Sequence, residues 1–239
     1  NEVIDRLERS RKVFEEDYPP PADFAHVSIV RVCASEEDFH RYGGTSEGTM
    51  GWFNPGSTEL VLFDAKEIDR NMSYAVMTHE AFHQYCHFLF GRSEAHRWFD
   101  EGHGDYYGGM KFDGQKPKIT AHMPGGLDRQ PVIREMLQLE TAEPLADHPN
   151  FDHGQWQNQG PSNVACYAQS WSIVYMLRQG MLGNVNPKVW HKEYAQILPS
   201  YIETLRKGFE DAYRVEREKR SKGKAGGQEA TGTSAEVIG

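Results

Sequence analysis

The pattern of apolar positions in the first third of the chain predicts one helix and the beginning of a sheet. Residues 2–17 place apolar side chains at imperfect helical spacing, and Tyr18, which is followed by three prolines, ends this helix. We expect the helix to lie on the outside of the fold. Residues 27–33 are rich in β-branched side chains and predict a strand, after which Ser35 can cap a short helix over residues 35–39.

Two further apolar runs predict a hairpin. Residues 51–53 and 59–63 are short, and the sequence Asn54-Pro-Gly-Ser between them has the composition of a tight turn. The N-terminal third is therefore expected to form a small antiparallel or mixed sheet.

Beyond the hairpin, the spacing of apolar positions becomes helical. We expect Ser73 to cap a helix over residues 73–90, which Gly91 ends. A second helix is predicted from about Arg97 to Tyr107, because the glycine pair after Tyr107 terminates it.

The remaining pattern completes an α+β fold, in which the small N-terminal sheet packs on a mostly helical C-terminal part. Further helices are predicted at residues 133–139, 163–179, 186–197 and 199–218. We interpret residues 1–19 as an N-terminal helix, residues 20–218 as a single domain and residues 219–239 as a flexible tail.

The composition argues against several classes of function. The 239 residues carry a formal net charge of −9, which disfavours a nucleic-acid surface, and no apolar run approaches the roughly 20 residues of a membrane span. Cys33, Cys86 and Cys166 form neither a disulfide framework nor a cysteine metal motif. Because the chain opens on Asn1 rather than Met, we expect a processed piece of a longer protein. Its compartment stays open, with export as one alternative, and so does its oligomeric state.

The sequence His79-Glu80-Ala81-Phe82-His83 carries the candidate chemistry. On a helix, His79 and His83 stand one turn apart on one face, where both imidazoles can reach a single metal ion. Glu80 then lies beside the metal, where a carboxylate can take a proton from a bound water. This pattern is the signature of zinc-dependent peptidases.

A catalytic zinc ion usually takes a third protein ligand, for which His87, Asp100, Glu101 and His103 are the candidates. His87 continues the same face, but positions i and i+8 are about 12 Å apart along a straight helix, which is too far. Glu101 and Asp105 share a face of the next helix, so Glu101 can bind the metal while Asp105 accepts a hydrogen bond from a ligand histidine. Asp100 could instead cap that helix.

The segment from Trp98 to Tyr107, WFDEGHGDYY, resembles the second half of the gluzincin signature, in which a Glu-Gly pair supplies the third metal ligand. Seventeen residues separate His83 from Glu101, close to the spacing in thermolysin-like and aminopeptidase N-like enzymes. The closest resemblance is to bacterial peptidase MA-like proteins. It implies a zincin-like fold and a Zn²⁺ ion held by His79, His83 and Glu101.

The segment departs from the family pattern at two positions. His103 and Gly104 stand where the family usually has apolar residues or alanine. We therefore expect His103 to add a polar group around the metal, and Gly104 to loosen the helix.

A third segment, Cys166-Tyr-Ala-Gln-Ser-Trp, resembles the helix of aminopeptidase N-like enzymes that carries an oxyanion-stabilising tyrosine. The matching residue is Tyr167, and a phenol suits this role because it can donate a hydrogen bond to the tetrahedral oxygen. The alternative is an ordinary buried tyrosine on an amphipathic helix. Tyr106, Tyr107 and His103 are rivals for the catalytic role.

These residues together predict a zinc metallopeptidase that hydrolyses a peptide or protein substrate with Glu80 as general base. Aminopeptidase N-like enzymes hold the substrate amine with a Gly-x-Met-Glu-Asn segment, and Gly48-Thr-Met-Gly-Trp lacks its glutamate, which favours an endopeptidase. By analogy, the substrate is expected to pair with an edge strand at residues 51–53 or 59–63. The alternatives are a non-catalytic domain that binds zinc or peptide, and helices that pack without a metal.

Overall fold

The computed structural model describes residues 2–21, 27, 29–43, 49–63, 69–157 and 163–228. The chain divides into two compact units, Asn1–Ile197 and Leu198–Gly239, each described here by itself. The larger unit contains every predicted site residue. The predicted domain boundaries after residues 19 and 218 stay predictions.

The larger unit begins with helix α1 (Glu2–Asp17) and a three-stranded mixed sheet. Strand β1 (Ile29–Cys33) is parallel to β3 (Glu59–Phe63), and β2 (Gly51–Asn54) forms the predicted antiparallel hairpin with β3. The sheet order is β1-β3-β2. Since β3 is paired on both sides, only β2 of the two expected edge strands is an edge of this sheet.

Alternation along β3 explains why this strand is central. Leu60 and Leu62 face helix α3, where they form a cluster with Met77. Val61 and Phe63 point to the other side of the sheet, where Phe39 of helix α2 (Glu36–Tyr42) covers them. All five residues of β3 are buried as a result. The α+β class and the mixed sheet predicted from the pattern are confirmed.

Helix α3 (Arg70–Leu89) begins three residues earlier than predicted, because Asp69 and not Ser73 is its cap. The Asp69 carboxylate accepts hydrogen bonds from the backbone N–H groups of Asn71 and Met72. The Ser73 hydroxyl donates to the Asp69 carbonyl from inside the helix. At the other end, Gly91 adopts a left-handed conformation with φ +65° and stops the helix, as predicted.

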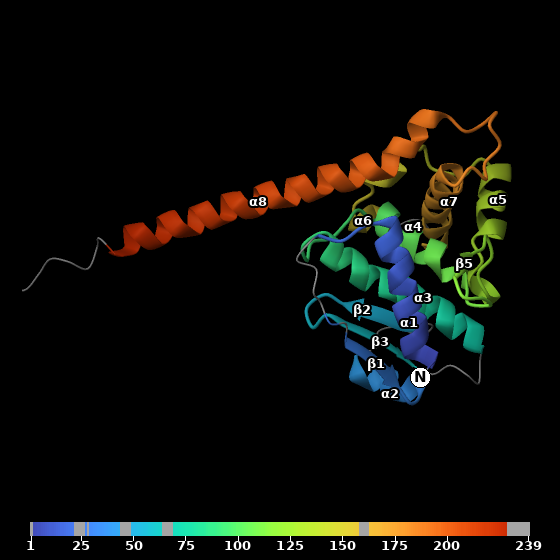
Figure 1. Ribbon diagram of the computed structural model, residues 1–239, viewed down its shortest axis with the longest axis horizontal. Helices are drawn as coiled ribbons and strands as arrows, with labels where there is room; N and C mark the ends of the chain where they lie inside the picture. Colours follow the sequence, from blue (N-terminus) through green and yellow to red (C-terminus); the bar gives the residue numbers. More distant parts are fainter. Residues whose placement is uncertain are drawn as a thin grey trace, which may run out of the picture. The chain divides into compact units, whose positions relative to one another are not determined.

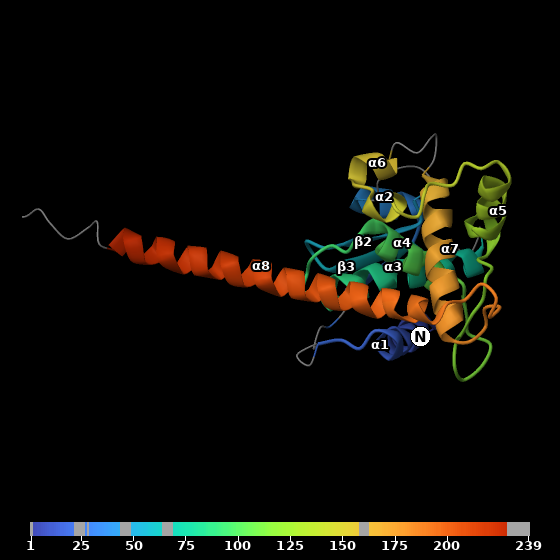
Figure 2. The same ribbon diagram turned by 90° about the horizontal axis from the view of Figure 1, so that it is seen from above.

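Helix α4 (Arg97–Gly108) packs against α3 on one side and against α7 (Val164–Met181) on the other. Figure 1 shows α3 between the sheet and α4, and Figure 2 shows α7 beside α4. Gly102 allows the second contact, because a Cβ atom there would lie 2.7 Å from the Ser170 carbonyl oxygen of α7. The predicted motif segments therefore lie on three neighbouring helices.

The other elements depart from the prediction in places. Helix α5 (Gln130–Gln138) agrees, but the helix expected at residues 186–197 is only the 3₁₀ turn η3 (Lys192–Gln196). The short elements are β4 (Met110–Lys111), β5 (Lys118–Ile119), η1 (Gly125–Leu127), η2 (His148–Asn150) and α6 (His153–Gln157).

In the smaller unit, helix α8 (Ile197–Gln228) continues ten residues past its predicted end, so the first part of the expected tail is helical. Residues 229–239 lie outside the described residues. Among the described helices, none combines the length and apolarity needed to cross a bilayer.

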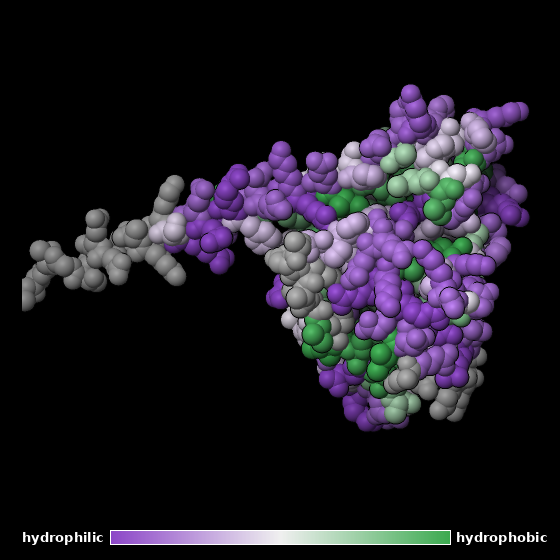
Figure 3. All heavy atoms as spheres, viewed as in Figure 1, coloured by the Kyte–Doolittle hydropathy of each residue, from purple (hydrophilic) through white to green (hydrophobic). Residues whose placement is uncertain are grey.

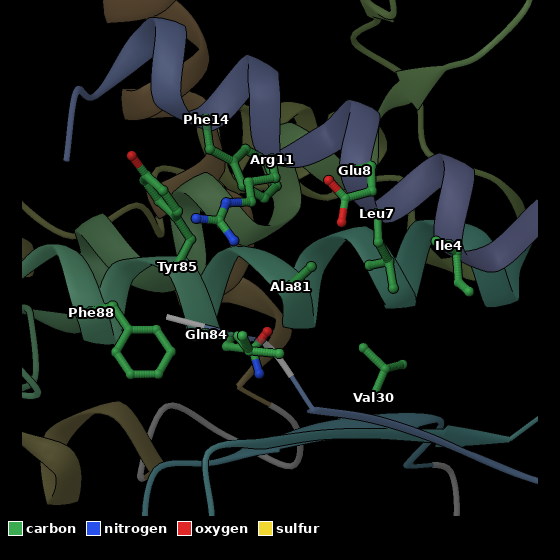
Figure 4. Close-up of a pocket in the computed structure, with 11 residues that line it drawn as sticks. Ile4, Leu7, Glu8, Arg11, Phe14, Val30, Ala81, Gln84, Tyr85 and Phe88 are labelled. Atoms are coloured by element: carbon green, nitrogen blue, oxygen red, sulfur yellow. The ribbon is translucent and has the colours of Figure 1, made fainter. Parts of the chain in front are cut away.

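A cavity of about 460 Å³ lies between α1, α3 and β1. Leu7 and Phe14 of α1 approach Ala81 and Tyr85 of α3 across it, with Val30 below (Figure 4). On the face shown in Figure 3, hydrophilic residues cover α1 and hydrophobic ones gather beside it, over the strands. The His79 and His83 side chains leave α3 on a different face from this cavity.

Candidate metal centre

Helix α3 brings His79 and His83 together one turn apart. Their Nε2 atoms are 2.9 Å from each other, and the two rings meet edge to face. One ligand atom from each of His79, Glu80 and His83 lies within 4.8 Å of the other two. This group can hold a metal ion.

Glu101 reaches the same point from helix α4. Its Oε2 atom is 3.3 Å from Nε2 of His79 and 3.4 Å from Nε2 of His83. Ligands about 2.0 to 2.1 Å from a tetrahedral zinc ion lie about 3.3 to 3.4 Å from one another, so both distances suit a shared metal. Oε2 is buried and has no hydrogen-bond partner within the described part of the chain. A buried acceptor in this position is what a metal ligand requires.

Glu80 is an alternative third donor, since its carboxylate lies within the same 4.8 Å group. Oε2 of Glu101 lies 3.3 and 3.4 Å from the two histidine nitrogens, which favours Glu101 as the ligand and leaves Glu80 beside the group. Strand β2 runs next to Glu80: a Cβ atom on Gly51 would lie 3.2 Å from Cγ of Glu80. The base of the predicted mechanism therefore faces the edge strand.

The outer nitrogen of His79 is held by Asp105, as the spacing predicted for a ligand histidine. Nδ1 of His79 lies 3.1 Å from Oδ1 of Asp105, which fixes the ring and directs Nε2 towards Glu101. Arg129 donates to Asp105 in turn, with 2.6 Å between Nε and Oδ2. Arg129 was not predicted, because it stands in an irregular segment with no motif around it.

The outer nitrogen of His83 has a carboxylate of its own. Nδ1 of His83 is 2.9 Å from Oδ1 of Asp100. Asp100 entered the prediction only as a ligand candidate or a helix cap, whereas the structure places it behind the second histidine. The signal in the sequence is that Asp100 directly precedes Glu101, the predicted ligand, on the same helix.

The carboxylates around the histidines set their protonation. Burial alone would lower the pKa of His79, but the adjacent carboxylates of Asp105 and Glu101 raise it to about 9. At His83 burial alone would also lower the pKa, but Asp100 and Glu101 raise it well above its usual range. Burial alone would raise the pKa of Glu101, yet the two histidines hold it far below its usual range. The cluster is therefore built to hold positive charge.

Tyr167 lies at the edge of this group. Its ring centroid is 6.5 Å from that of His79, Trp156 packs against its ring, and the Arg129 guanidinium lies 5.2 Å from its centroid. Tyr167 also lines a cleft of about 330 Å³, together with the metal group and with Trp52 and Phe53 of β2. Burial and the nearby carboxylates raise the pKa of the Tyr167 phenol, so it keeps its proton.

The structure does not bring His103 to the metal group. Its Nδ1 lies 2.7 Å from the Phe99 carbonyl and its Nε2 contacts the Tyr18 hydroxyl, so both nitrogens are engaged elsewhere. His103 is therefore not the extra polar group expected near the metal. The rival Tyr107 is also engaged elsewhere, because its hydroxyl donates to Asp17.

Gly104 has a different consequence from the one expected. A Cβ atom at this position would lie 2.8 Å from Cε1 and Nδ1 of His79. The glycine therefore gives the His79 ring the space to lie against α4, and any larger residue would displace it.

All three cysteines are buried free thiols, and Cys86 lines the cleft. The site is thus built from two histidines and a glutamate at the centre, two aspartates behind the histidines, and a second glutamate and a tyrosine at the cleft. Comparisons of the chain with protein-family models, curated proteins and solved structures give no match, so the geometry of these residues carries the interpretation.

Proposed function

We propose that this protein is a zinc-dependent peptidase of the gluzincin type with a zincin-like fold. The observation that carries the proposal is the convergence of Nε2 of His79, Nε2 of His83 and Oε2 of Glu101 within 3.4 Å of one another. Two imidazoles and one carboxylate are donors that zinc accepts, and three protein ligands leave the open position of a catalytic site.

When bound, zinc supplies Lewis acidity that polarises a water molecule and the substrate carbonyl. Glu80 is the general base: its carboxylate lies beside the ligand histidines, where it accepts a proton from the attacking water. Burial raises the pKa of Glu80 above its ordinary value, which improves the match to a proton that must be taken up and then released. Glu80 delivers this proton to the leaving amine.

Asp105 holds His79 by a hydrogen bond in the tautomer that presents Nε2 to the metal, and the Asp100 carboxylate beside Nδ1 of His83 favours the same tautomer there. Tyr167 donates a hydrogen bond from its protonated phenol to the oxygen that becomes negative in the transition state. The substrate lies extended in the cleft, beside the free edge of β2. An endopeptidase is the favoured class, because the chain lacks the segment that holds a substrate amine.

The test is the variant Glu80→Gln, which keeps the size of the side chain and removes its basicity. We expect zinc to stay bound while cleavage of a peptide library falls by at least about a hundredfold, the contribution of a general base. Mass spectrometry reads the cleavage, with and without chelator, and elemental analysis reads the zinc. Glu37→Gln, on the exposed surface of α2, is the matched control and should behave as the wild type does.

Full activity of Glu80→Gln would overturn the mechanism. Wild-type protein that holds zinc and cleaves no peptide would instead support the alternative, a non-catalytic domain that binds zinc or peptide. Protein that contains no metal would support the third alternative, in which the helices pack without a metal ion.

A further inference from the structure

Arg97 is the first residue of α4 and stands one turn before Glu101. Its Nη1 atom donates to Oε1 of Glu101 over 3.2 Å, while Oε2 of the same carboxylate faces the two histidines. The two oxygens of Glu101 therefore have separate partners. Glu101 is almost fully buried, and Arg97 lines the cleft with about a third of its side chain exposed.

This division matters because a carboxylate can bind a metal ion through one oxygen or through both. With two histidines already present, a glutamate that binds through both oxygens fills four positions. A catalytic zinc ion needs one of these positions for water. A donor that engages Oε1 competes with this second mode.

Arg97 is itself held in place. Its Nη2 atom donates to Nδ1 of His153 on α6, over 2.7 Å. The planar guanidinium thus spans two partners, and a rigid fork loses less freedom per hydrogen bond than a lysine side chain does. His153 thus gives the guanidinium a second partner beside Glu101.

We propose that Arg97 is a positioning residue that restricts Glu101 to one-oxygen binding and so keeps a ligand position open for water. This inference rests on the proposed role of Glu101 as the third zinc ligand. The pair of Arg41 with Glu37, also one turn apart, lies on an exposed helix surface. The pair of Arg97 differs because its glutamate is buried against two histidines.

The experiment replaces the metal by Co²⁺, whose visible absorption bands weaken as its coordination number rises. In Arg97→Met we expect cobalt to remain bound and its bands to weaken, as Oε1 joins the metal. With zinc, kcat should fall by about tenfold while KM changes little, in line with other changes behind metal ligands. Arg97→Lys keeps the positive charge but loses the planar guanidinium. Its cobalt spectrum should lie between those of the wild type and Arg97→Met.

Two controls separate the outcomes. Arg41→Met removes an exposed pair of the same type that does not line the cleft, and it should leave spectrum and kcat unchanged. Glu101→Gln must alter the cobalt spectrum if Glu101 is a ligand. Wild-type spectra and kcat in both Arg97 variants, with Glu101→Gln altered, would overturn the role of Arg97 alone. An unaltered spectrum in Glu101→Gln, or no cobalt binding by the wild type, would overturn the proposed metal site as well.

Discussion

His79 and His83, which are partly buried, form one group, and the fully buried His103 forms a second that behaves in the opposite way. His79 and His83 have raised pKa values, and that of His79 is about 9. His103, two residues after Glu101 on α4, is fully buried, and burial lowers its pKa to about 3. Burial opposes the charged form in both groups, so the neighbours decide the outcome.

The neighbours differ in charge. The Nδ1 atoms of His79 and His83 each face an aspartate, and their Nε2 atoms share a glutamate. His103 contacts a carbonyl and a phenol, and it packs against Phe99 with 4.2 Å between ring centroids. A buried histidine with carboxylates on both sides attracts a cation, whereas one among aromatic rings remains a neutral part of the core.

The largest expected effect follows from removing one member of the first group. His83→Ala should weaken zinc binding by more than about a hundredfold, since structural sites gain about 10 to 16 kcal/mol from three or four ligands together. His103→Gln is the matched change in the second group and should leave zinc affinity within a few fold. Competition with a chromophoric chelator measures both. Equal losses in the two variants would remove the distinction between the groups.

A smaller effect is expected where the two helices touch. Gly104→Ala places a methyl group against the His79 ring and should displace it from Asp105, with a loss of about 10- to 100-fold in zinc affinity. Gly126→Ala is its control, because a Cβ atom there meets nothing within 4 Å. Unchanged affinity in Gly104→Ala, measured by the same competition, would show that the ring needs no space from the glycine.

The sequence predicts the elements of the site better than their surroundings. Helical periodicity places His79 and His83 on one face. The spacing on the next helix predicts Glu101 as the third ligand and Asp105 as the acceptor for a ligand histidine. Position within a helix is local information, which one sequence contains. Arg129 reaches Asp105 from a segment 24 residues away, and no local pattern encodes such a contact.

The wrong expectation for His103 has the same origin. His103 replaces an apolar or alanine residue of the family pattern and is expected on that ground to add a polar group around the metal, but two residues along a helix turn a side chain by about 200° from Glu101. The direction away from the metal is filled by Tyr18, which follows α1 and is 85 residues distant in the chain. Ser73 was similarly chosen as a cap from its residue type, while Asp69 offered the same chemistry one turn earlier.

The smallest expected effect concerns stability against pH, and it tests the second group directly. The folded protein keeps His103 neutral down to about pH 3, whereas an unfolded histidine takes up a proton near pH 6.5. Between these values the unfolded chain binds one proton more, so His103 makes the protein less stable as pH falls, by about 1.4 kcal/mol per pH unit. In His103→Gln this contribution disappears. The free energy of unfolding, measured with urea between pH 6 and 4, should therefore fall less steeply with pH than in the wild type.

Chelator must be present in both samples, because protonation of His79 and His83 also releases metal in this range. Without metal these two histidines act in the opposite direction: the raised pKa of His79 adds stability that is complete below pH 6.5 and is lost as pH rises through about 9. If the free energy of unfolding depends on pH in His103→Gln as it does in the wild type, His103 takes up its proton in the folded state. The neutral core histidine and the cation-binding pair would then no longer differ in kind.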